Sequence, residues 1–327
     1  MGNIVVDVGG TNLRIGYFEN DALVDVQRVP VQNFHKNCGL ASDALYRQFL
    51  DQLLSEIKVL LGSYPTASVG IAFPGPVNPK GKVAYAPTLW GNRLHDIDLR
   101  TDLELLLNRK TYVLNDISAA VWRYVTPKQE DFCLITISSG IGNKVYRKGE
   151  ILVNEYGFGG EIGHSRVAEG IEALRCDCGG EGHLGGLASG RGTLALAQLY
   201  ANLYANELAQ SPLAAQRPEH WSTTDIVSAL HADDDFAWMV CTAGQRYLVT
   251  AMRHLYHWIG IRKFIFIGGF VSAIGAPYTA RLHQILKEED WFGMSVSELE
   301  TMCALGAIDD DHSLIGMGRY LEMQGVT

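Results

Sequence analysis

Two histidines and two cysteines in one short stretch have the chemistry of a metal site. His164 is followed by a spacer of eleven residues, and then come Cys176, Cys178 and His183. Two imidazoles and two thiolates form a ligand set that a tetrahedral Zn²⁺ accepts. Glycines at positions 179, 180 and 182 permit the turns that wrap a short loop around an ion. We therefore predict a zinc site; the alternative is a Gly-rich surface loop with two incidental thiols.

The pair Asn115-Asp116 is a second candidate for chemistry. An apolar run over residues 112–114 predicts a strand, and a helix is expected from about Ser118. The pair therefore stands at the carboxyl end of a strand, where side chains of α/β sheets project into the crevice. Asp116 is a candidate catalytic carboxylate on this ground. The alternative is that it only caps the helix that follows.

The composition limits the classes of protein to consider. A chain of 327 residues is long enough for two domains, and 47% hydrophobic with 19% charged residues is ordinary for a soluble globular protein. The net charge of −9 argues against nucleic acid as the main partner but does not exclude ATP. Charged and histidine residues interrupt the longest apolar stretches, so we expect no membrane span.

The cysteine usage and the N-terminus predict a cytoplasmic protein. Six cysteines, two of them in the metal cluster, do not make a disulfide framework. We therefore expect Cys38, Cys133, Cys241 and Cys303 to be reduced. The chain enters a strand pattern directly, so we expect no signal peptide.

The N-terminal pattern is a strand, a Gly-rich turn and a second strand. Residues 3–7 form an apolar run, Gly9 and Gly10 mark the turn, and an alternating run follows over residues 13–18. A P-loop or a dinucleotide fold would differ, because there the Gly-rich turn opens a helix. The same plan returns over residues 133–146, with Ser139 and Gly140 in the turn. A plain hairpin is the alternative for either turn taken alone.

Periodicity predicts the remaining elements. We expect a helix that Ser42 can cap and that Gly62 and Pro65 stop. A strand over 67–73, a helix opening at 188–192 and a long helix over 235–258 are also expected. A strand over 264–267 should end in Gly268-Gly269. Residues 206–222 have the most linker-like composition and are expected to form a surface loop.

The spacing of the metal ligands resembles the zinc signature of the ROK family (repressors, open reading frames, sugar kinases). That signature runs Gly-His, a spacer, and Cys-x-Cys-Gly-x-x-Gly-Cys-x-Glu, and here it corresponds to Gly163-His164 and residues 176–185. The third Cys of the family is His183 here, which keeps a zinc ligand. The closing Glu, which helps hold the sugar in the family, is Gly185 here. The resemblance extends from Asp-x-Gly-Gly-Thr-Asn at 7–12 to residues 306–320 and so covers nearly the whole chain.

The resemblance implies a two-domain actin-like ATPase (ribonuclease H-like) fold of α/β class, with duplicated mixed sheets and an interdomain cleft. We expect a small N-terminal α/β domain over residues 1–116 plus about 305–327, and a large α/β domain over 117–304 that carries the zinc loop. A phosphate loop from each half would face the cleft, and Asp7 would face Mg²⁺ through water. The ATP-binding residues that the resemblance implies are Asp7, Gly10, Thr11, Asn12, Ser139, Gly140, Gly268 and Gly269.

The activity that the resemblance implies is ATP-dependent phosphorylation of a hydroxyl, the primary one, of a hexose or hexose-like substrate. Asp116 would accept the proton of the attacking hydroxyl. Zinc would be structural, because four protein ligands leave no open position for chemistry. The residues implied in substrate binding are Asn115, Glu161, His164 and Gly75.

Gly185 bears on which substrate is bound. A charged acceptor is missing there, so we infer that the substrate differs from glucose at that edge, as an amino sugar or a C7 cyclitol would. The alternative is a glucokinase in which a nearby group such as Glu181 compensates.

Two other classes of protein fit the sequence less well. A non-catalytic, sugar-sensing ROK repressor would carry a helix-turn-helix before the phosphate loop, and the loop begins here at Asp7, so we do not expect this class. An actin-like ATPase that acts on a protein partner is disfavoured by the zinc cluster. The resemblance also implies a homodimer.

Overall fold

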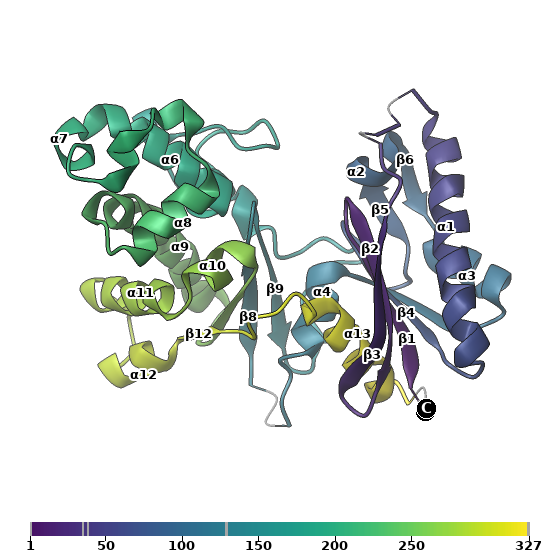
Figure 1. Cartoon of the computed structure of the whole chain (residues 1–327). Helices are drawn as coiled ribbons and strands as arrows, with labels where there is room; N and C mark the ends of the chain where they lie inside the picture. Colours follow the sequence, from purple (N-terminus) through teal and green to yellow (C-terminus); the bar gives the residue numbers. More distant parts are fainter. Residues whose placement is uncertain (1, 35, 38, 128–129, 326–327) are drawn as a thin grey trace. The chain divides into compact units, whose positions relative to one another are not determined.

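The computed structural model describes residues 2–34, 36–37, 39–127 and 130–325 (Figure 1). The chain divides into two compact units. Unit 1 comprises residues 1–129, 151–159 and 311–327, and unit 2 comprises residues 130–150 and 160–310. Cys38 lies outside the described residues. No helix in the described ranges combines the length and the hydropathy that a membrane span requires.

Unit 1 is built on a five-stranded mixed sheet in the order β3-β2-β1-β4-β7. The predicted N-terminal hairpin is confirmed, because β1 and β2 pair antiparallel on either side of the Gly9-Gly10 turn. β4 pairs parallel with both β1 and β7. The strands are β1 (Asn3–Val8), β2 (Asn12–Glu19), β3 (Ala22–Pro30), β4 (Val69–Phe73) and β7 (Thr111–Asn115), with a separate pair β5 (Val83–Ala86) and β6 (Gly91–Ile97).

The second sheet repeats this order as β10-β9-β8-β11-β12. β8 and β9 form the second predicted hairpin, and β11 pairs parallel with both β8 and β12. The predicted duplication of mixed sheets is therefore confirmed. The strands are β8 (Phe132–Ile137), β9 (Ile141–Arg147), β10 (Glu150–Ile151), β11 (Phe264–Ile267) and β12 (Cys303–Leu305).

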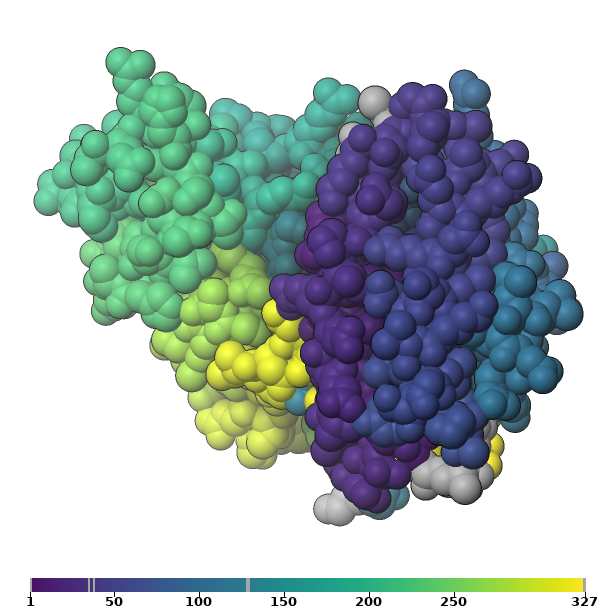
Figure 2. All heavy atoms as spheres, turned by 45° about the vertical axis from the view of Figure 1, so that its right-hand side comes forward, coloured from purple at the N-terminus to yellow at the C-terminus, as the bar shows by residue number. Residues whose placement is uncertain are grey.

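Helices cover both faces of the unit 1 sheet because its central strand is apolar on both sides. On β1, Ile4 and Val6 belong to the core cluster that includes the buried side of α1, whereas Val5 packs in the cluster that includes α13. The polar side of α1 lies on the molecular surface, in the indigo region of Figure 2. The helices of unit 1 are α1 (Ser42–Ser63), α2 (Pro87–Trp90), α3 (Leu99–Leu107), α4 (Asp116–Trp122) and α13 (His312–Met323).

Helices make up most of unit 2 after the second hairpin. Residues 206–222, predicted as a surface loop, contain short helical turns instead, because Pro212 and Pro218 stand at first-turn positions that suit proline. The α-helices are α5 (Gly185–Ala188), α6 (Gly190–Leu203), α7 (Ala205–Leu208), α8 (Thr223–His231), α9 (Asp235–Ile259), α10 (Gly269–Ile274), α11 (Ala276–Glu288) and α12 (Val296–Thr301). The 3₁₀ turns are η1 (Ile162–His164), η2 (Gly170–Glu172), η3 (Pro212–Ala215) and η4 (Pro218–His220).

Unit 1 ends later along the chain than the boundary after Asp116 that the sequence suggested. α4, which begins at Asp116, packs against α13, and Ala119 shares a buried cluster with Leu314 and Met317. This packing keeps α4 in the same unit as the strand that precedes it. The C-terminal segment joins unit 1 from Asp311, whereas the sequence placed its start at about 305.

The contact between α13 and α4 allows no side chain at Gly316, because a Cβ there would overlap the carbonyl oxygen of Ala119. We predict that Gly316→Ala separates the two helices and lowers the free energy of unfolding by about 1–3 kcal/mol, as overpacking does. Urea denaturation measures this change. Gly62→Ala is the matched control, since a Cβ at Gly62 meets nothing within 4 Å. Equal stability of the two variants would contradict the packing described here.

Candidate functional site

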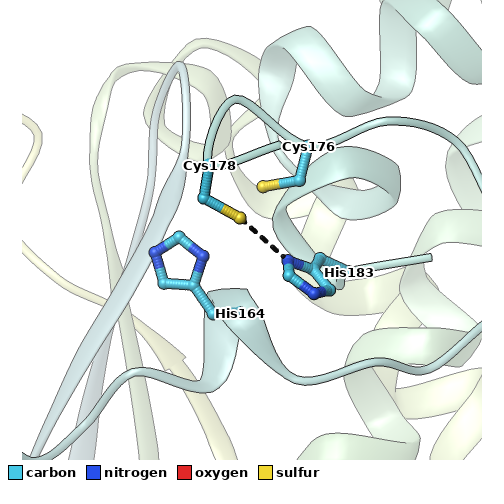
Figure 3. Close-up of side chains that lie close together, drawn as sticks. All are labelled: His164, Cys176, Cys178 and His183. Carbon is cyan, nitrogen blue, oxygen red and sulfur yellow. Dashed lines mark hydrogen bonds between the residues drawn. The ribbon is translucent and has the colours of Figure 1, made fainter. Parts of the chain in front are cut away.

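The four predicted metal ligands converge in unit 2 (Figure 3). His164 ends η1, and the other three lie on the irregular loop that precedes α5. One ligand atom from each of His164, Cys176, Cys178 and His183 lies within 4.8 Å of all the others. The Sγ atom of Cys178 is 3.2 Å from Nδ1 of His183, the contact dashed in Figure 3. The loop thus brings together donors that are up to 19 positions apart in the sequence.

The backbone of the loop shapes this cluster. The N–H of Cys176 donates to the carbonyl of Gly180 at 2.8 Å, and the N–H of Gly179 donates back to the carbonyl of Cys176 at 2.8 Å. Gly179 and Gly182 have φ angles of 89° and 69°, in the left-handed region that favours glycine. A Cβ at Gly180 would overlap the ring of His183. The predicted role of the glycines therefore has a structural basis at three positions.

A carboxylate anchors the start of the loop. Glu172, at the end of η2, accepts hydrogen bonds from the hydroxyls of Tyr200 at 2.6 Å and Tyr247 at 2.5 Å. Burial, followed by the bond to Glu172, raises the pKa of Tyr247 to about 12 and also raises the pKa of Tyr200. Both tyrosines therefore stay protonated donors at neutral pH. They tie the loop to α6 and α9.

The donor set and its spacing fit a zinc ion. With Zn–S and Zn–N bonds of normal length, tetrahedral ligand atoms lie about 3.3–3.8 Å apart. The observed limit of 4.8 Å therefore requires only a small contraction. Burial is the main cause that raises the pKa of the Cys176 thiol, so a cation has to displace its proton to bind. Cys133 and Cys241 are not part of this cluster. Both thiols are fully buried, and burial raises the pKa of each to about 12.

A cavity of about 420 Å³ adjoins the cluster and is called the metal-side cavity below. It is bordered by the metal loop, by the turn between β8 and β9 and by the start of α6. Its lining residues are Ser139, Gly140, Ile141, Gly163, His164, Arg175, Cys176, Asp177, Gly185, Gly186, Ser189, Arg191, Gly192 and Ala195.

A second cavity of about 350 Å³, called the Gly269 cavity below, lies beside the same turn. The predicted nucleotide residues Ser139 and Gly269 both line it. Gly268 is just before it and has a φ of 104°, and a Cβ there would approach the carbonyl oxygen of Ile137 to 2.8 Å. The lining residues are Ser138, Ser139, Gly190, Arg191, Thr223, Thr224, Val227, Gly269, Phe270 and Ala273.

In unit 1, Asp7 is held by an arginine that the sequence interpretation missed. Oδ2 of Asp7 accepts from Nη2 of Arg14 at 2.6 Å and from its Nε at 3.1 Å. Nη1 of Arg14 reaches Asp311 at 3.2 Å. Arg14 stands opposite Asp7 in the β1–β2 register, and this pairing is the signal that was available in the predicted hairpin.

The other predicted residues of this turn are close by in the chain. The carbonyl of Gly10 accepts from Nδ2 of Asn33 at 2.7 Å, and Nδ2 of Asn12 donates to Oγ1 of Thr11 at 3.2 Å. Thr11 is exposed. The turn of the first hairpin therefore presents polar groups at the surface of unit 1.

Asn115, and not Asp116, caps α4. Its Oδ1 accepts from the N–H of Ser118 at 3.1 Å. Its Nδ2 donates to Oδ1 of Asp116 at 2.8 Å and to the carbonyl of Gly75 at 3.0 Å. Asp116 occupies the first position of the helix, and its Oδ1 also accepts from the N–H of Ile117 at 2.8 Å. The alternative in which Asp116 serves as the cap is wrong, and Gly75, Asn115 and Asp116 form one connected group.

Glu161 is paired with a lysine that was also missed. Nζ of Lys144 lies 3.6 Å from Oε1 of Glu161. The side chain of Lys144 is only 4% exposed, whereas that of Glu161 is 51% exposed. The position of Lys144 on β9 did not identify Glu161 as its partner.

Comparisons with known proteins identify the family. The sequence profile described as "ROK family" matches residues 3–317. This chain belongs to the ROK family. The ROK chain is 39% identical over 324 residues to a C(7)-cyclitol 7-kinase of Streptomyces hygroscopicus subsp. limoneus, covering 97% of this chain and 92% of that protein.

Two further relatives match over shorter stretches. A 2-epi-5-epi-valiolone 7-kinase of an Actinoplanes species is 30% identical over 210 residues, which are 60% of this ROK chain and 57% of that protein. An N-acetylmannosamine kinase of Vibrio cholerae is 28% identical over 193 residues, which are 58% of this chain and 62% of that protein.

Solved structures show the fold of this ROK protein. The ROK hexokinase of Thermus thermophilus matches with a TM-score of 0.72 and 22% identity over 99% of this chain and 100% of that one. A ROK family glucokinase of Streptomyces griseus, solved with glucose and AMPPNP, matches with a TM-score of 0.70 and 20% identity, with the same coverage. The predicted actin-like ATPase fold with two mixed sheets is confirmed.

The convergence of the four donors predicts about one zinc ion per chain in protein purified without chelator. We expect Cys178→Ala to lose the ion, because three remaining ligands hold it far more weakly. Elemental analysis by inductively coupled plasma mass spectrometry measures the content. Cys241→Ala is the matched control, as Cys241 is buried away from the cluster and should keep the ion. Wild-type protein without a transition metal would refute the site.

Proposed function

We propose that this chain, an ATP-dependent sugar kinase of the ROK family, phosphorylates the exocyclic primary hydroxyl of a C7 cyclitol. The observation that carries the proposal is the 39% identity to a C(7)-cyclitol 7-kinase over 97% of the chain. A second relative named as a kinase of a valiolone, at position 7, supports the same substrate class. The proposed hydroxyl is the one that both names specify.

The absence of a carboxylate at Gly185 supports a substrate other than glucose. Among the residues lining the metal-side cavity, the only carboxylate is Asp177, and it pairs with Arg191. Glu181, the group that might have compensated in a glucokinase, is exposed and does not line this cavity. A hydrogen bond to a charged acceptor is worth about 1.5–3 kcal/mol, so glucose would lose that much binding here.

Amino sugars are the second candidate substrate. An N-acetylmannosamine kinase matches about three-fifths of the chain, and Gly185 offers no carboxylate that would select glucose. The cyclitol is preferred because the cyclitol kinase matches nearly the full length of the chain.

Asp116 would act as the base. Phosphoryl transfer asks the protein mainly for positioning and charge stabilisation, with a proton acceptor near the attacking oxygen. The amide of Asn115 and the N–H of Ile117 both donate to Oδ1 of Asp116 and so fix the orientation of the carboxylate. Asn115 acts here through Asp116, in addition to the substrate contact implied by the resemblance. Glu161, oriented by Lys144, and His164 would accept or donate to the hydroxyls of the ring.

The cofactors are ATP with Mg²⁺ and a structural Zn²⁺. Mg²⁺ neutralises charge on the phosphates when it is bound. Oδ2 of Asp7 is occupied by Arg14, which leaves Oδ1 as the oxygen for the water shell of Mg²⁺. Zinc would order the loop that carries His164, Asp177 and Gly185. The homodimer, the cytoplasmic location and the lack of a nucleic-acid or membrane partner stay predictions.

Substitution of Gly185 tests the substrate class. A Cβ at this position would lie 3.1 Å from the carbonyl oxygen of Gly163, a tight contact that Gly185→Glu and Gly185→Ala share. We expect Gly185→Glu to raise kcat/KM for glucose about tenfold relative to a C7 cyclitol such as valiolone, because a charged acceptor returns. Gly185→Ala is the matched control, since it adds the Cβ without the carboxylate and should leave the preference unchanged.

The assay is a coupled measurement of ADP release with valiolone-type cyclitols, N-acetylmannosamine and glucose as acceptors. The wild type should have its highest kcat/KM with a cyclitol, and Asp116→Asn should lose at least about 100-fold in kcat with every acceptor. Highest activity with glucose would contradict the cyclitol proposal. Near-normal turnover by Asp116→Asn would remove Asp116 from the role of base.

A further inference from the structure

Arg191 occupies an unusual place in unit 2, because it lines both cavities. Only Ser139 shares this property among the residues that line them. In the Gly269 cavity Arg191 is also the only charged residue of the lining; the others are small, hydroxyl-bearing or apolar. A single cation, the guanidinium of Arg191, therefore borders both the Gly269 cavity and the metal-side cavity.

The backbone beneath Arg191 is held firmly. Ser189 is fully buried and caps α6 through a bond from the N–H of Gly192 at 3.0 Å. Its hydroxyl also donates to the carbonyl of Gly185 at 2.6 Å. The N–H of Gly190 donates to the carbonyl of Ser138 at 2.8 Å. The start of α6 is therefore fastened to the turn between β8 and β9, and the side chain of Arg191 begins from a fixed point.

The guanidinium bridges that turn and the metal loop. Its Nε donates to the carbonyl of Ser139 at 2.9 Å. Its Nη2 pairs with Oδ2 of Asp177, the residue between the two cysteine ligands. Of the five N–H groups of an arginine, those on Nη1 have no partner among the described residues. The side chain is oriented by two contacts and still has donors to offer.

The pair with Asp177 is open to exchange. The side chains of Arg191 and Asp177 are 58% and 68% exposed, and an exposed ion pair of this kind contributes little to stability. A nucleotide phosphate carries more charge than a carboxylate and accepts two parallel bonds from a guanidinium. It would compete successfully with Asp177 for the same donors.

We propose that Arg191 binds a phosphate group of the nucleotide and that Asp177 keeps its guanidinium oriented while the nucleotide is absent. The cation would add to the hydroxyl and backbone donors of the turn at Ser139, which are uncharged. The proposal rests on the proposed ATP-dependent function and specifies how unit 2 recognises the phosphates. Because Asp177 is part of the metal loop, the same exchange connects nucleotide binding with the loop that borders the second cavity.

The competing interpretation is that Arg191 only links the metal loop to the turn between β8 and β9. The two interpretations differ in what Asp177 does. If Arg191 binds phosphate, Asp177 competes with the nucleotide, so its removal leaves affinity unchanged or raises it. If Arg191 acts only by linking the metal loop to the turn, removal of either Arg191 or Asp177 weakens nucleotide binding to a similar extent.

Isothermal titration calorimetry with adenosine, ADP and ATP as magnesium salts, without any acceptor, separates these cases. We expect Arg191→Gln to weaken ATP binding about 10- to 100-fold, as loss of a charged hydrogen bond does, and to change adenosine binding less than about twofold. Arg191→Lys keeps the charge but not the paired donors and should lie between the wild type and Arg191→Gln. Asp177→Asn should bind ATP at least as tightly as the wild type.

Arg217→Gln is the matched control, since Arg217 is an exposed arginine of the same unit that lines neither cavity. Its ATP affinity should equal that of the wild type. Unchanged ATP affinity in Arg191→Gln, or equal losses for adenosine and ATP, would overturn the proposal while leaving the kinase function intact. A loss of ATP affinity in Asp177→Asn as large as that in Arg191→Gln would favour the purely structural link and would also overturn the proposal. A wild type that binds no ATP would overturn both the proposal and the kinase function.

Discussion

The convergence of two thiols and two imidazoles is the constraint on which the site of unit 2 depends. The segment from His164 to His183 has little regular secondary structure, so its shape comes from local turns and from specific anchors. Glycines with left-handed backbone at 179 and 182 and the tyrosine bonds to Glu172 supply some of that order. A bound ion would supply the rest, because four bonds to one centre fix the relative positions of residues far apart in sequence. His164 and residues 175–177 of this segment border the metal-side cavity.

The duplicated sheets explain why chemistry gathers at the hairpin turns. In both sheets the central strand pairs with an antiparallel partner on one side and a parallel strand on the other. Each hairpin turn therefore lies at the edge of its sheet where the parallel strands have their carboxyl ends. Asn115 ends β7 at this edge of the first sheet, and Gly268 follows β11 at this edge of the second. Because of this topology, side chains and backbone donors lie at the same edge of each sheet. The apolar strands behind the turns hold them in place.

The parts of the fold that local sequence determines were predictable. The hairpins follow from apolar runs broken by Gly9-Gly10 and by Gly140, and the metal cluster follows from donor type and spacing. Ser42 failed as a predicted cap, because Ala41 takes that position and no side chain bonds the first turn. Local pattern does not choose between adjacent residues at a helix start.

The contacts that tune the candidate site were not predictable from the sequence. The exception is Arg14 with Asp7, because the register of the predicted hairpin sets the two residues opposite each other. Lys144 with Glu161 is an ion pair between different segments, and neither residue type nor spacing identifies the partner. The same holds for Arg191 with Asp177, which appears only when the metal loop is folded beside α6. The resemblance to the ROK family indicated the residues that perform chemistry in that family. It did not show the charged neighbours that orient them.

We propose that one zinc ion, bound by two sulfurs and two nitrogens, orders the loop that borders the metal-side cavity. X-ray absorption spectroscopy at the zinc K-edge of the purified protein tests it most directly. We expect a four-coordinate shell with two sulfur ligands at about 2.3 Å and two nitrogen ligands at about 2.0–2.1 Å. A shell of oxygen and nitrogen alone, or no zinc edge, would contradict it.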